Sequence, residues 1–529
     1  MIWSTWLREH CPAGATAPQS PAPAPPKQDE DEVPSSCIPL RFGRSQIVKA
    51  SPEAIAPLPH GDDGTESPCG QPGVLNSIKC WFGWGKKPWP LPPDDVFYGI
   101  KLTPDDLKDY ELGQVVKSRE IFLTPFFGLD ADGLKAWQLL FVTTGGPKAS
   151  PYKQVTVTTI IVPANSKGDR VIAYQPKTNS ASSLWRTSYA LRAGGSQSSN
   201  SMSELVFLGP MLDRGWICAV SDYLGQNDAF GAGLQSGHAV LDGIRAVIEF
   251  SELKIDRVKV RVVGYGYSGG AIATGFAAQL ARSYAPDVEA KVQGWCLGGL
   301  PVDLKQIATH VNNTLVAGVI VGVVQGLANT YPQLQQYLAD SLTSAASKYF
   351  SQAKLTGFWS VVRASAGADI LGLISGNASS DPSYFKPTFD LMTDKVPAMV
   401  MEENRMGADP KQVPRKPLLI ACSLHDEIVP IKAPDELVER WGKGGATIEY
   451  IRDQLSAHAL LSFTSYSACV RWMGDRLEGE PNEAKAGKPW IRNLTTTLTD
   501  DGDEELLGKR RYDDLKKTCE RRQRENFWC

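Results

Sequence analysis

The sequence has few of the features that would direct a protein to nucleic acid or to a metal. Its 55 lysine and arginine residues are outnumbered by 58 aspartate and glutamate residues, which leaves a net charge of −3. Phosphate binding needs a clustered basic surface, so nucleic acid is not expected as the main partner. The ten cysteines include no CxxC pair and no cluster with histidine at zinc spacing, so no metal site is predicted.

Long apolar runs are also missing. The apolar start of the chain, residues 1–7, is ended by Arg8 and is too short for a secretory signal, whose apolar core spans about 7–15 residues. No run reaches the roughly 18 apolar residues of a transmembrane helix. The longest candidate, residues 315–324, is interrupted by glycine. The sequence therefore predicts a soluble protein without a visible targeting signal.

The composition does provide for a large core, because 42% of the 529 residues are hydrophobic, and this excludes wholesale disorder. The two ends of the chain differ from this average. Residues 1–87 begin with eight prolines in the first forty positions and are predicted to be a disordered leader, since proline fixes φ and lacks a donor. Residues 481–529 are highly charged and are predicted to be a solvated tail.

Between these ends, short apolar runs alternate with helical patterns. One such helical pattern covers residues 233–251, where apolar side chains recur at the spacing of one helix face. Strands that alternate with helices indicate an α/β fold with a mostly parallel sheet covered on both faces. The predicted strands are residues 137–144, 154–163, 170–175, 215–221, 258–264, 291–297, 417–423 and 447–451.

A mostly helical block at residues 301–400 interrupts this alternation. We expect it to form a cap or lid over the carboxyl edge of the sheet, where α/β proteins bind their ligands. The core is thereby divided into residues 88–300 and 401–480. Apolar residues with helical spacing in the cap fit an acyl tunnel and ordinary cap core equally well: Leu315, Val316, Val319, Ile320, Val323 and Val324.

The strongest motif is GYSGG at residues 266–270, which follows the predicted strand 258–264 and opens a helix of small residues. This context is typical of a nucleophile elbow, in which a serine occupies a strained turn between strand and helix. Small neighbours are required there, because the turn brings the backbones close together. A bare GxSxG also occurs in glycine-rich turns, but its position here favours Ser268 as a catalytic nucleophile.

A serine nucleophile needs a base, and the base needs an acid to orient it. Only three histidines follow Ser268, and in this type of fold the acid precedes the histidine. His310 falls in the cap and His425 precedes the best acid, which leaves His458 as the base. Asp426 follows the apolar strand 417–423 and is the favoured acid. Glu427 is the nearest alternative, and two others are poorer, a helical Asp435 and a surface Asp453.

The order of these motifs resembles the fungal secretory lipase family, of the lipase-A type. The runs that carry the resemblance are PPDDVFY, SDYLG, HAVLDGIRA, GYGYSGGAIATGFAAQLA, LGGLPVDL and HDEIVP, followed by the isolated His458. They span residues 92–475 and leave both flanks outside. The resemblance implies an α/β-hydrolase fold with a helical lid, and a triad of Ser268, Asp426 and His458.

The resemblance also implies an oxyanion hole made by the backbone N–H groups of Gly269 and Asn179. The second donor is placed by similarity to a YQxxxDS pattern, in which an aspartate usually stands where this chain has Asn179. Relatives of this kind are secreted, which implies an extracellular location. The alternative is an intracellular one, because no signal peptide is visible. The disulfides of secreted relatives have no match here, and three core cysteines are predicted to be buried thiols: Cys218, Cys296 and Cys422.

Taken together, the sequence predicts a serine carboxylic-ester hydrolase of lipase type that needs no cofactor or metal. Its expected substrates are acylglycerols or related lipid esters, met at a lipid–water interface. One alternative keeps the triad for a deacetylase, an esterase or an acyltransferase that acts on a fungal secondary metabolite. A second alternative is a binding module on a hydrolase fold, although such modules typically lose a triad member and none is lost here.

Overall fold

The computed structural model describes residues 90–124, 133–192, 199–342, 350, 353–354, 356–371, 389–495, 513 and 517. For residues 199–205 only the backbone is described. All elements discussed below belong to one compact unit within residues 68–515. The proline-rich leader predicted at the start of the chain lies outside the described residues, up to position 89.

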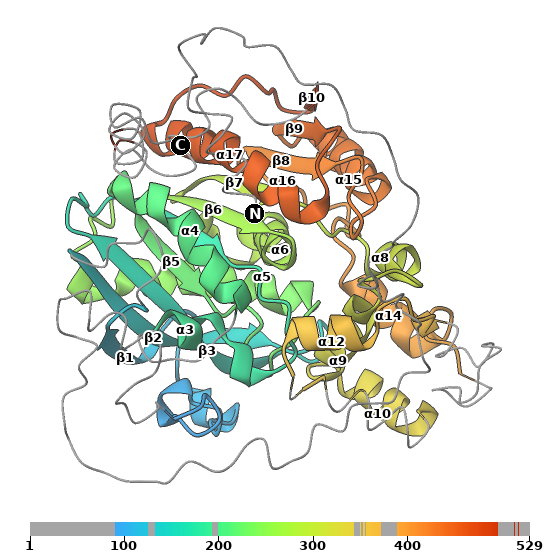
Figure 1. Ribbon diagram of the computed structural model, residues 1–529. Coiled ribbons are helices and arrows are strands. Elements are labelled where there is room, and N and C mark those ends of the chain that lie inside the picture. Colours follow the sequence, from blue (N-terminus) through green and yellow to red (C-terminus); the bar gives the residue numbers. More distant parts are fainter. Residues whose placement is uncertain are drawn as a thin grey trace, which may run out of the picture. The chain divides into compact units, whose positions relative to one another are not determined.

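The unit is built on one ten-stranded sheet, in the order β1-β2-β3-β5-β4-β6-β7-β8-β9-β10 (Figure 1). The first three neighbouring pairs in this order are antiparallel, and all other neighbours run parallel. The strands are β1 (Val115–Ile121), β2 (Leu134–Gly145), β3 (Tyr152–Pro163), β4 (Arg170–Gln175), β5 (Ile217–Ser221), β6 (Arg261–Tyr267), β7 (Val292–Gly298), β8 (Leu418–Ser423), β9 (Ile448–Asp453) and β10 (Trp490–Leu494).

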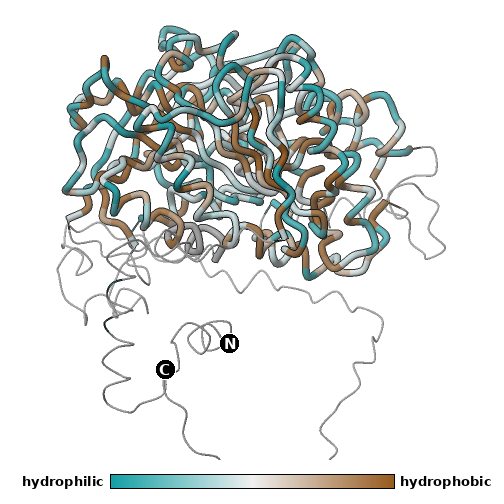
Figure 2. Tube along the Cα trace, turned by 90° about the horizontal axis from the view of Figure 1, so that it is seen from above, coloured by the Kyte–Doolittle hydropathy of each residue, from teal (hydrophilic) through white to brown (hydrophobic). Residues whose placement is uncertain are grey.

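Helices cover both faces of the sheet. Side chains of α5 (Gly233–Glu249), α6 (Gly269–Tyr284) and α15 (Lys432–Lys443) enter one apolar cluster, and those of α4 (Ser199–Asp213) and α17 (Tyr466–Glu478) enter another. The central strands are buried on both sides, so they read as continuous apolar runs without alternation. Figure 2 shows these hydrophobic stretches in the interior, with hydrophilic residues along the outer loops.

The described elements between β7 and β8 are all helices: α8 (Leu304–Val311), α9 (Gly318–Ala328), α10 (Pro332–Ser341), α12 (Phe358–Ala364) and α14 (Lys395–Glu403). They share an apolar cluster of their own, which contains Val319, Ile320 and Val324 and leaves a narrow hollow of about 40 Å³. The prediction that Leu315 belongs to an apolar helix face is wrong, because this residue lies in a turn before α9 and is 76% exposed. Of the six residues of this face, Val319, Ile320 and Val324 are buried, and Val316 and Val323 are partly buried against the same cluster.

The remaining short elements connect these layers. They are α3 (Thr187–Leu191), α7 (Pro286–Glu289) and α16 (His458–Thr464), with the 3-10 turns η3 (Val96–Tyr98), η4 (Asp105–Leu107), η5 (Ser183–Trp185) and η6 (Ser251–Leu253). No helix among the described residues has both the length and the apolar character that crossing a bilayer requires.

The eight predicted strands all appear, but the strand before the serine begins three residues later than expected. The carboxylate of Asp256 accepts hydrogen bonds from the N–H groups of Val258 (3.0 Å) and Lys259 (3.2 Å), which holds these residues in a turn. Val258 is therefore 85% exposed instead of facing the core. The local turn chemistry of an aspartate outweighs the apolar alternation here.

Within the predicted C-terminal tail, residues 490–494 do not form a solvated tail but add strand β10 to the sheet. Strand β10 pairs in parallel with β9, from Trp490 opposite Glu449 to Leu494 opposite Asp453. Arg492 adds an ion pair to the carboxylate of Glu449 at 2.7 Å. An edge strand carries little apolar signal because one of its faces and one of its edges meet water.

Truncation tests the contribution of β10. A chain ending at residue 480 should unfold at a lower temperature than a matched chain ending at residue 495. Loss of β10 exposes the unpaired edge of β9, and it leaves the nearly buried Glu449 without Arg492. Thermal melts and light scattering on both chains measure the difference, and equal midpoints with equal aggregation would contradict this role of β10.

Candidate active site

Ser268 lies between strand β6 and helix α6, in the strained turn that the motif predicts. Its backbone has φ 53° and ψ −120°, a conformation that a residue with a side chain rarely adopts. The turn is held on both sides. The N–H of Ser268 donates to the carbonyl of Gly298 at 2.9 Å, and its own carbonyl accepts from Ala271 at 2.8 Å. The elbow therefore keeps the serine hydroxyl in a fixed position at a helix N-terminus.

Two glycines after the serine allow a close approach of the neighbouring loop. A Cβ on Gly270 would collide with the carbonyl oxygen of Gln175, the last residue of β4. A Cβ on Gly269 would collide with the side-chain oxygen of Asn179, in the loop that follows. Larger residues here would push β4 and its loop away from the serine.

His458 and Asp426 complete a chain of hydrogen bonds to this serine. The Nε2 atom of His458 lies 2.9 Å from the Oγ of Ser268, and its Nδ1 atom lies 2.7 Å from a carboxylate oxygen of Asp426. The other oxygen of Asp426 accepts from the N–H groups of Ile428 (2.9 Å) and Val429 (2.7 Å). All three predicted residues are more than 90% buried and form the geometry of a catalytic triad.

The backbone of His458 is held independently of its ring. The carboxylate of Glu427 accepts a hydrogen bond from the N–H of His458 at 2.7 Å, so this alternative acid contacts the main chain and not the imidazole. The hydroxyl of Tyr267 donates to the carbonyl of His458 at 2.6 Å. Burial raises the pKa of Tyr267 well above its ordinary value, so this hydroxyl remains a donor.

The other candidates lie elsewhere. His425 is exposed, and Asp435 in α15 accepts from the hydroxyl of Tyr450 at 2.8 Å. The ring of His310, in α8, lies 3.3 Å from the main-chain carbonyl of Asp426, so it contacts the acid's backbone from the cap.

Asp453 is not a surface residue, as the sequence suggested, but a fully buried one. It is the last residue of β9, and its carboxylate accepts from the N–H groups of Leu455 (2.9 Å) and Ser456 (2.7 Å). It therefore shapes the turn that leads to His458. The sequence signal for this role is an aspartate at the end of a strand, because its carboxylate can accept from the N–H groups two and three residues further on.

Asn179 lies against Gly269, so both expected oxyanion residues come together. The side-chain oxygen of Asn179 is buried and finds no hydrogen-bond partner among the described residues. Gly269 is the first residue of α6, where an N–H group has no acceptor within the helix. The two residues line the same side of the elbow, on the loop after β4 and the start of α6.

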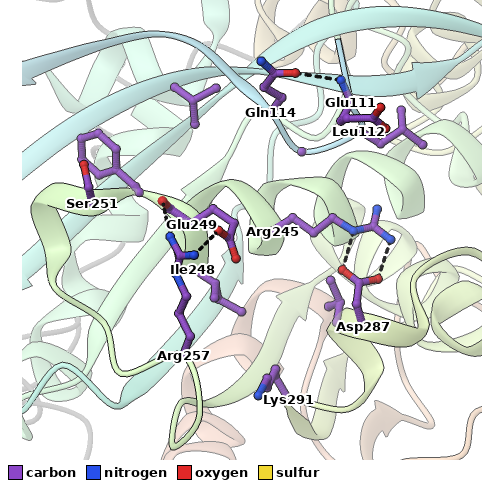
Figure 3. Close-up of a pocket in the computed structure, with 14 residues that line it drawn as sticks. Glu111, Leu112, Gln114, Arg245, Ile248, Glu249, Ser251, Arg257, Asp287 and Lys291 are labelled. Carbon is purple, nitrogen blue, oxygen red and sulfur yellow. Dashed lines mark hydrogen bonds and ion pairs between the residues drawn. The ribbon is translucent and has the colours of Figure 1, made fainter.

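A second hollow, of about 610 Å³, is lined by residues of α5, the segment 111–115 and the turn before β7, with none of the triad among them. Figure 3 shows that its arginines are already paired, Arg245 with Asp287 and Arg257 with Glu249, each at 2.7 Å. Over the described part of the chain, no group of three or more His, Cys, Asp or Glu side chains is arranged to hold a metal. The four described cysteines are buried and free, as predicted for Cys218, Cys296 and Cys422.

The triad geometry agrees with comparison to known sequences. The sequence model of a family described as "Secretory lipase" matches residues 194–484, more than half of the chain and a range that includes Ser268, Asp426 and His458. The chain belongs to the secretory lipase family. It is accordingly an ester hydrolase of the lipase type, as the sequence analysis predicted.

Relatives within the secretory lipase family match most of the chain. A secreted triacylglycerol lipase of Malassezia globosa, LIP4, is 31% identical over 397 residues, which are 74% of this chain and 83% of the relative. Lipase A of Arthroderma benhamiae is 32% identical over 441 residues, covering 80% and 88% of the two chains. The structure of Candida antarctica lipase A in its closed state has a TM-score of 0.68 at 23% identity, covering 81% and 96%. This structural likeness confirms the predicted α/β-hydrolase fold.

The triad geometry leads to a test of His458 as the base and of His425 as a residue without a catalytic role. Ser268→Ala, His458→Ala and the double variant should be about equally inactive, because residues that act as a unit are not additive. The expected loss in turnover is on the order of a million-fold, as for serine proteases with the same unit. Turnover of a short nitrophenyl ester measures it, with circular dichroism to verify folding.

His425→Ala is the matched control for these variants. The exposed ring of His425 takes no part in the hydrogen-bond chain, so this variant should keep most of the wild-type turnover. An inactive but folded His425→Ala, together with an active His458→Ala, would reverse the assignment of the base.

Proposed function

We propose that this lipase-family chain cleaves esters of lipid alcohols, acylglycerols in particular, through an acyl-enzyme on Ser268. The observation that carries the proposal is the continuous path from the serine Oγ through the imidazole of His458 to the carboxylate of Asp426, with links of 2.9 and 2.7 Å. A buried, fixed path of this kind raises the nucleophilicity of a hydroxyl that is otherwise weak at neutral pH.

In the first half-reaction, His458 Nε2 takes the proton of Ser268 as Oγ attacks the ester carbonyl carbon. Asp426 holds the Nδ1–H of the ring and stabilises the imidazolium that forms. The tetrahedral intermediate then collapses. The ester C–O bond breaks, and His458 gives its proton to the departing alcohol oxygen. The acyl group remains on Ser268.

Deacylation repeats these steps with water. His458 takes a proton from water, whose oxygen attacks the acyl carbon. In the second tetrahedral intermediate the bond to Ser268 Oγ breaks, His458 returns the proton to that oxygen, and the fatty acid is released. In both halves the negative oxygen is stabilised by the N–H groups of Gly269 and Asn179. The position of Gly269 at the first turn of α6 supports this role, since the dipole of the helix also favours negative charge there.

The preference for lipid esters is supported by two observations. The relative from Malassezia globosa is named a secreted triacylglycerol lipase. In addition, the segment around the catalytic histidine exposes large apolar side chains, with Leu455 65%, Leu460 53% and Phe463 43% exposed. An apolar surface beside the base suits a substrate that is presented at a lipid–water interface. We propose that the helical block at residues 301–400 covers the site as a lid.

A panel of nitrophenyl esters from acetate to palmitate tests the substrate class. We expect kcat/KM to rise with acyl length. A fluorophosphonate should label the wild type at Ser268 but should not label the Ser268→Ala variant. A preference confined to acetate would favour the deacetylase alternative. Unlabelled, active protein that transfers acyl groups to added alcohol faster than to water would favour an acyltransferase. An unlabelled serine in folded protein would favour a binding module.

The second oxyanion donor can be tested by deleting its N–H. Asn179→Pro removes this donor, because proline has no N–H, and should lower turnover by roughly a hundred- to a thousand-fold. Asn179→Ala is the matched control. It keeps the N–H and removes a side-chain oxygen that has no hydrogen-bond partner among the described residues, so its loss in turnover should be much smaller.

Thermal melts of both variants separate a distorted loop from a lost donor. Near wild-type turnover by a folded Asn179→Pro would remove this residue from the oxyanion hole.

A further inference from the structure

The loop that carries Asn179 is held by the hydroxyl of Tyr223, and the hydroxyl of Thr178 in this loop also lies 2.6 Å from that of Thr187. Residues 176–179 follow β4, and the N–H of Thr178 donates to the carbonyl of Pro176 at 2.7 Å, which makes the loop a tight turn. The hydroxyl of Tyr223 lies 2.8 Å from the carbonyl oxygen of Pro176 and 3.3 Å from that of Thr178. One side chain therefore holds two of the three carbonyls that precede Asn179.

The same hydroxyl lies beside the other expected donor. It is 3.3 Å from the place that a Cβ on Gly269 would occupy. Tyr223 thus bonds to the loop after β4 and lies close to the start of α6. Gly269 and Asn179 come from separate elements, so the relative placement of their N–H groups depends on what joins these elements.

Tyr223 is itself fixed by the sheet. Its side chain is 1% exposed, and the residue before it is held on both backbone groups. The N–H of Asp222 donates to Val157 at 2.8 Å, and its carbonyl accepts from the hydroxyl of Thr156 at 2.6 Å. Both partners belong to β3. The hydroxyl of Tyr223 is therefore presented from a rigid support and not from a mobile loop.

We propose that Tyr223 is the positioning residue of the oxyanion hole and sets the distance between the N–H groups of Asn179 and Gly269. The inference rests on the proposed function. A tyrosine hydroxyl has one hydrogen, and here that hydrogen is directed to loop carbonyls, so Tyr223 acts through the loop and not on the oxyanion. Oxyanion donors act at about 2.7–3.1 Å, and a misplacement of about 1 Å can lower the rate a hundred-fold.

The test is Tyr223→Phe, which keeps the buried ring and removes only the hydroxyl. We expect kcat to fall by about ten- to a hundred-fold while KM changes by less than about threefold, because the hole binds the transition state and not the ester ground state. Affinity for a trifluoromethyl ketone, which forms a tetrahedral adduct with the serine, should weaken by the same factor as kcat/KM.

The matched control is Tyr450→Phe, which also removes a hydroxyl from a buried tyrosine. That hydroxyl donates to Asp435 at 2.8 Å, away from the oxyanion loop. Both variants should lose similar stability in thermal melts, but only Tyr223→Phe should lose kcat. Turnover is normalised to sites titrated to completion with a fluorophosphonate. If Tyr223→Phe folds poorly, 3-fluorotyrosine at position 223 keeps the hydroxyl and should retain near wild-type kcat and inhibitor affinity.

The outcomes separate this inference from the proposed function. A wild type that hydrolyses no ester and is not labelled at Ser268 overturns both. An active wild type, with Tyr223→Phe turning over within threefold of Tyr450→Phe, overturns the positioning role alone. A raised KM with unchanged kcat also overturns the positioning role, because that result places Tyr223 in substrate binding.

Discussion

The strained backbone of Ser268 is the constraint on which the rest of the site depends. A φ of 53° at a residue with a side chain persists only where the surroundings fix it more strongly than the strain opposes it. Strand β6, helix α6 and the carbonyl of Gly298 provide this fixation, and the glycines after the serine allow β4 to approach. In this strained conformation the hydroxyl of Ser268 lies 2.9 Å from the imidazole of His458, so the strain is accompanied by a fixed orientation of the nucleophile.

The parallel sheet then explains how distant segments meet. Strands β4, β6, β8 and β9 end at the same edge of the sheet. They are followed in turn by the loop of Asn179, by Ser268, by Asp426 and by His458. Ser268 and His458 are 190 residues apart in sequence and share a hydrogen bond. The helices inserted between β7 and β8 lengthen this separation without changing the edge, because the insertion leaves the pairing of these two strands intact.

Sequence patterns were sufficient for the features with a strong local signal. The elbow follows from GYSGG after an apolar strand, and the buried central strands follow from their continuous apolar runs. The edge strands β1 and β10 were missed, because their solvent-facing residues dilute the apolar pattern. The contacts of Tyr223 and Glu427 could not be predicted either, since each side chain bonds to the backbone of residues far away in sequence. Asp453 is different, because its carboxylate bonds to residues two and three positions further on, a local signal that the strand pattern does not include. Chain order, in contrast, predicts His458 as the base among three histidines, and the structure places its Nε2 atom 2.9 Å from the Oγ of Ser268.

The contact between His310 and the carbonyl of Asp426 links the cap to the acid in a mechanical sense. Helix α8 is the first element of the insertion after β7, and the residue near its end rests on the loop that orients the imidazole. A displacement of α8 must either break this contact or carry the acid loop with it. A helix inserted between β7 and β8 thus contacts the backbone of the residue whose carboxylate lies 2.7 Å from the ring of His458.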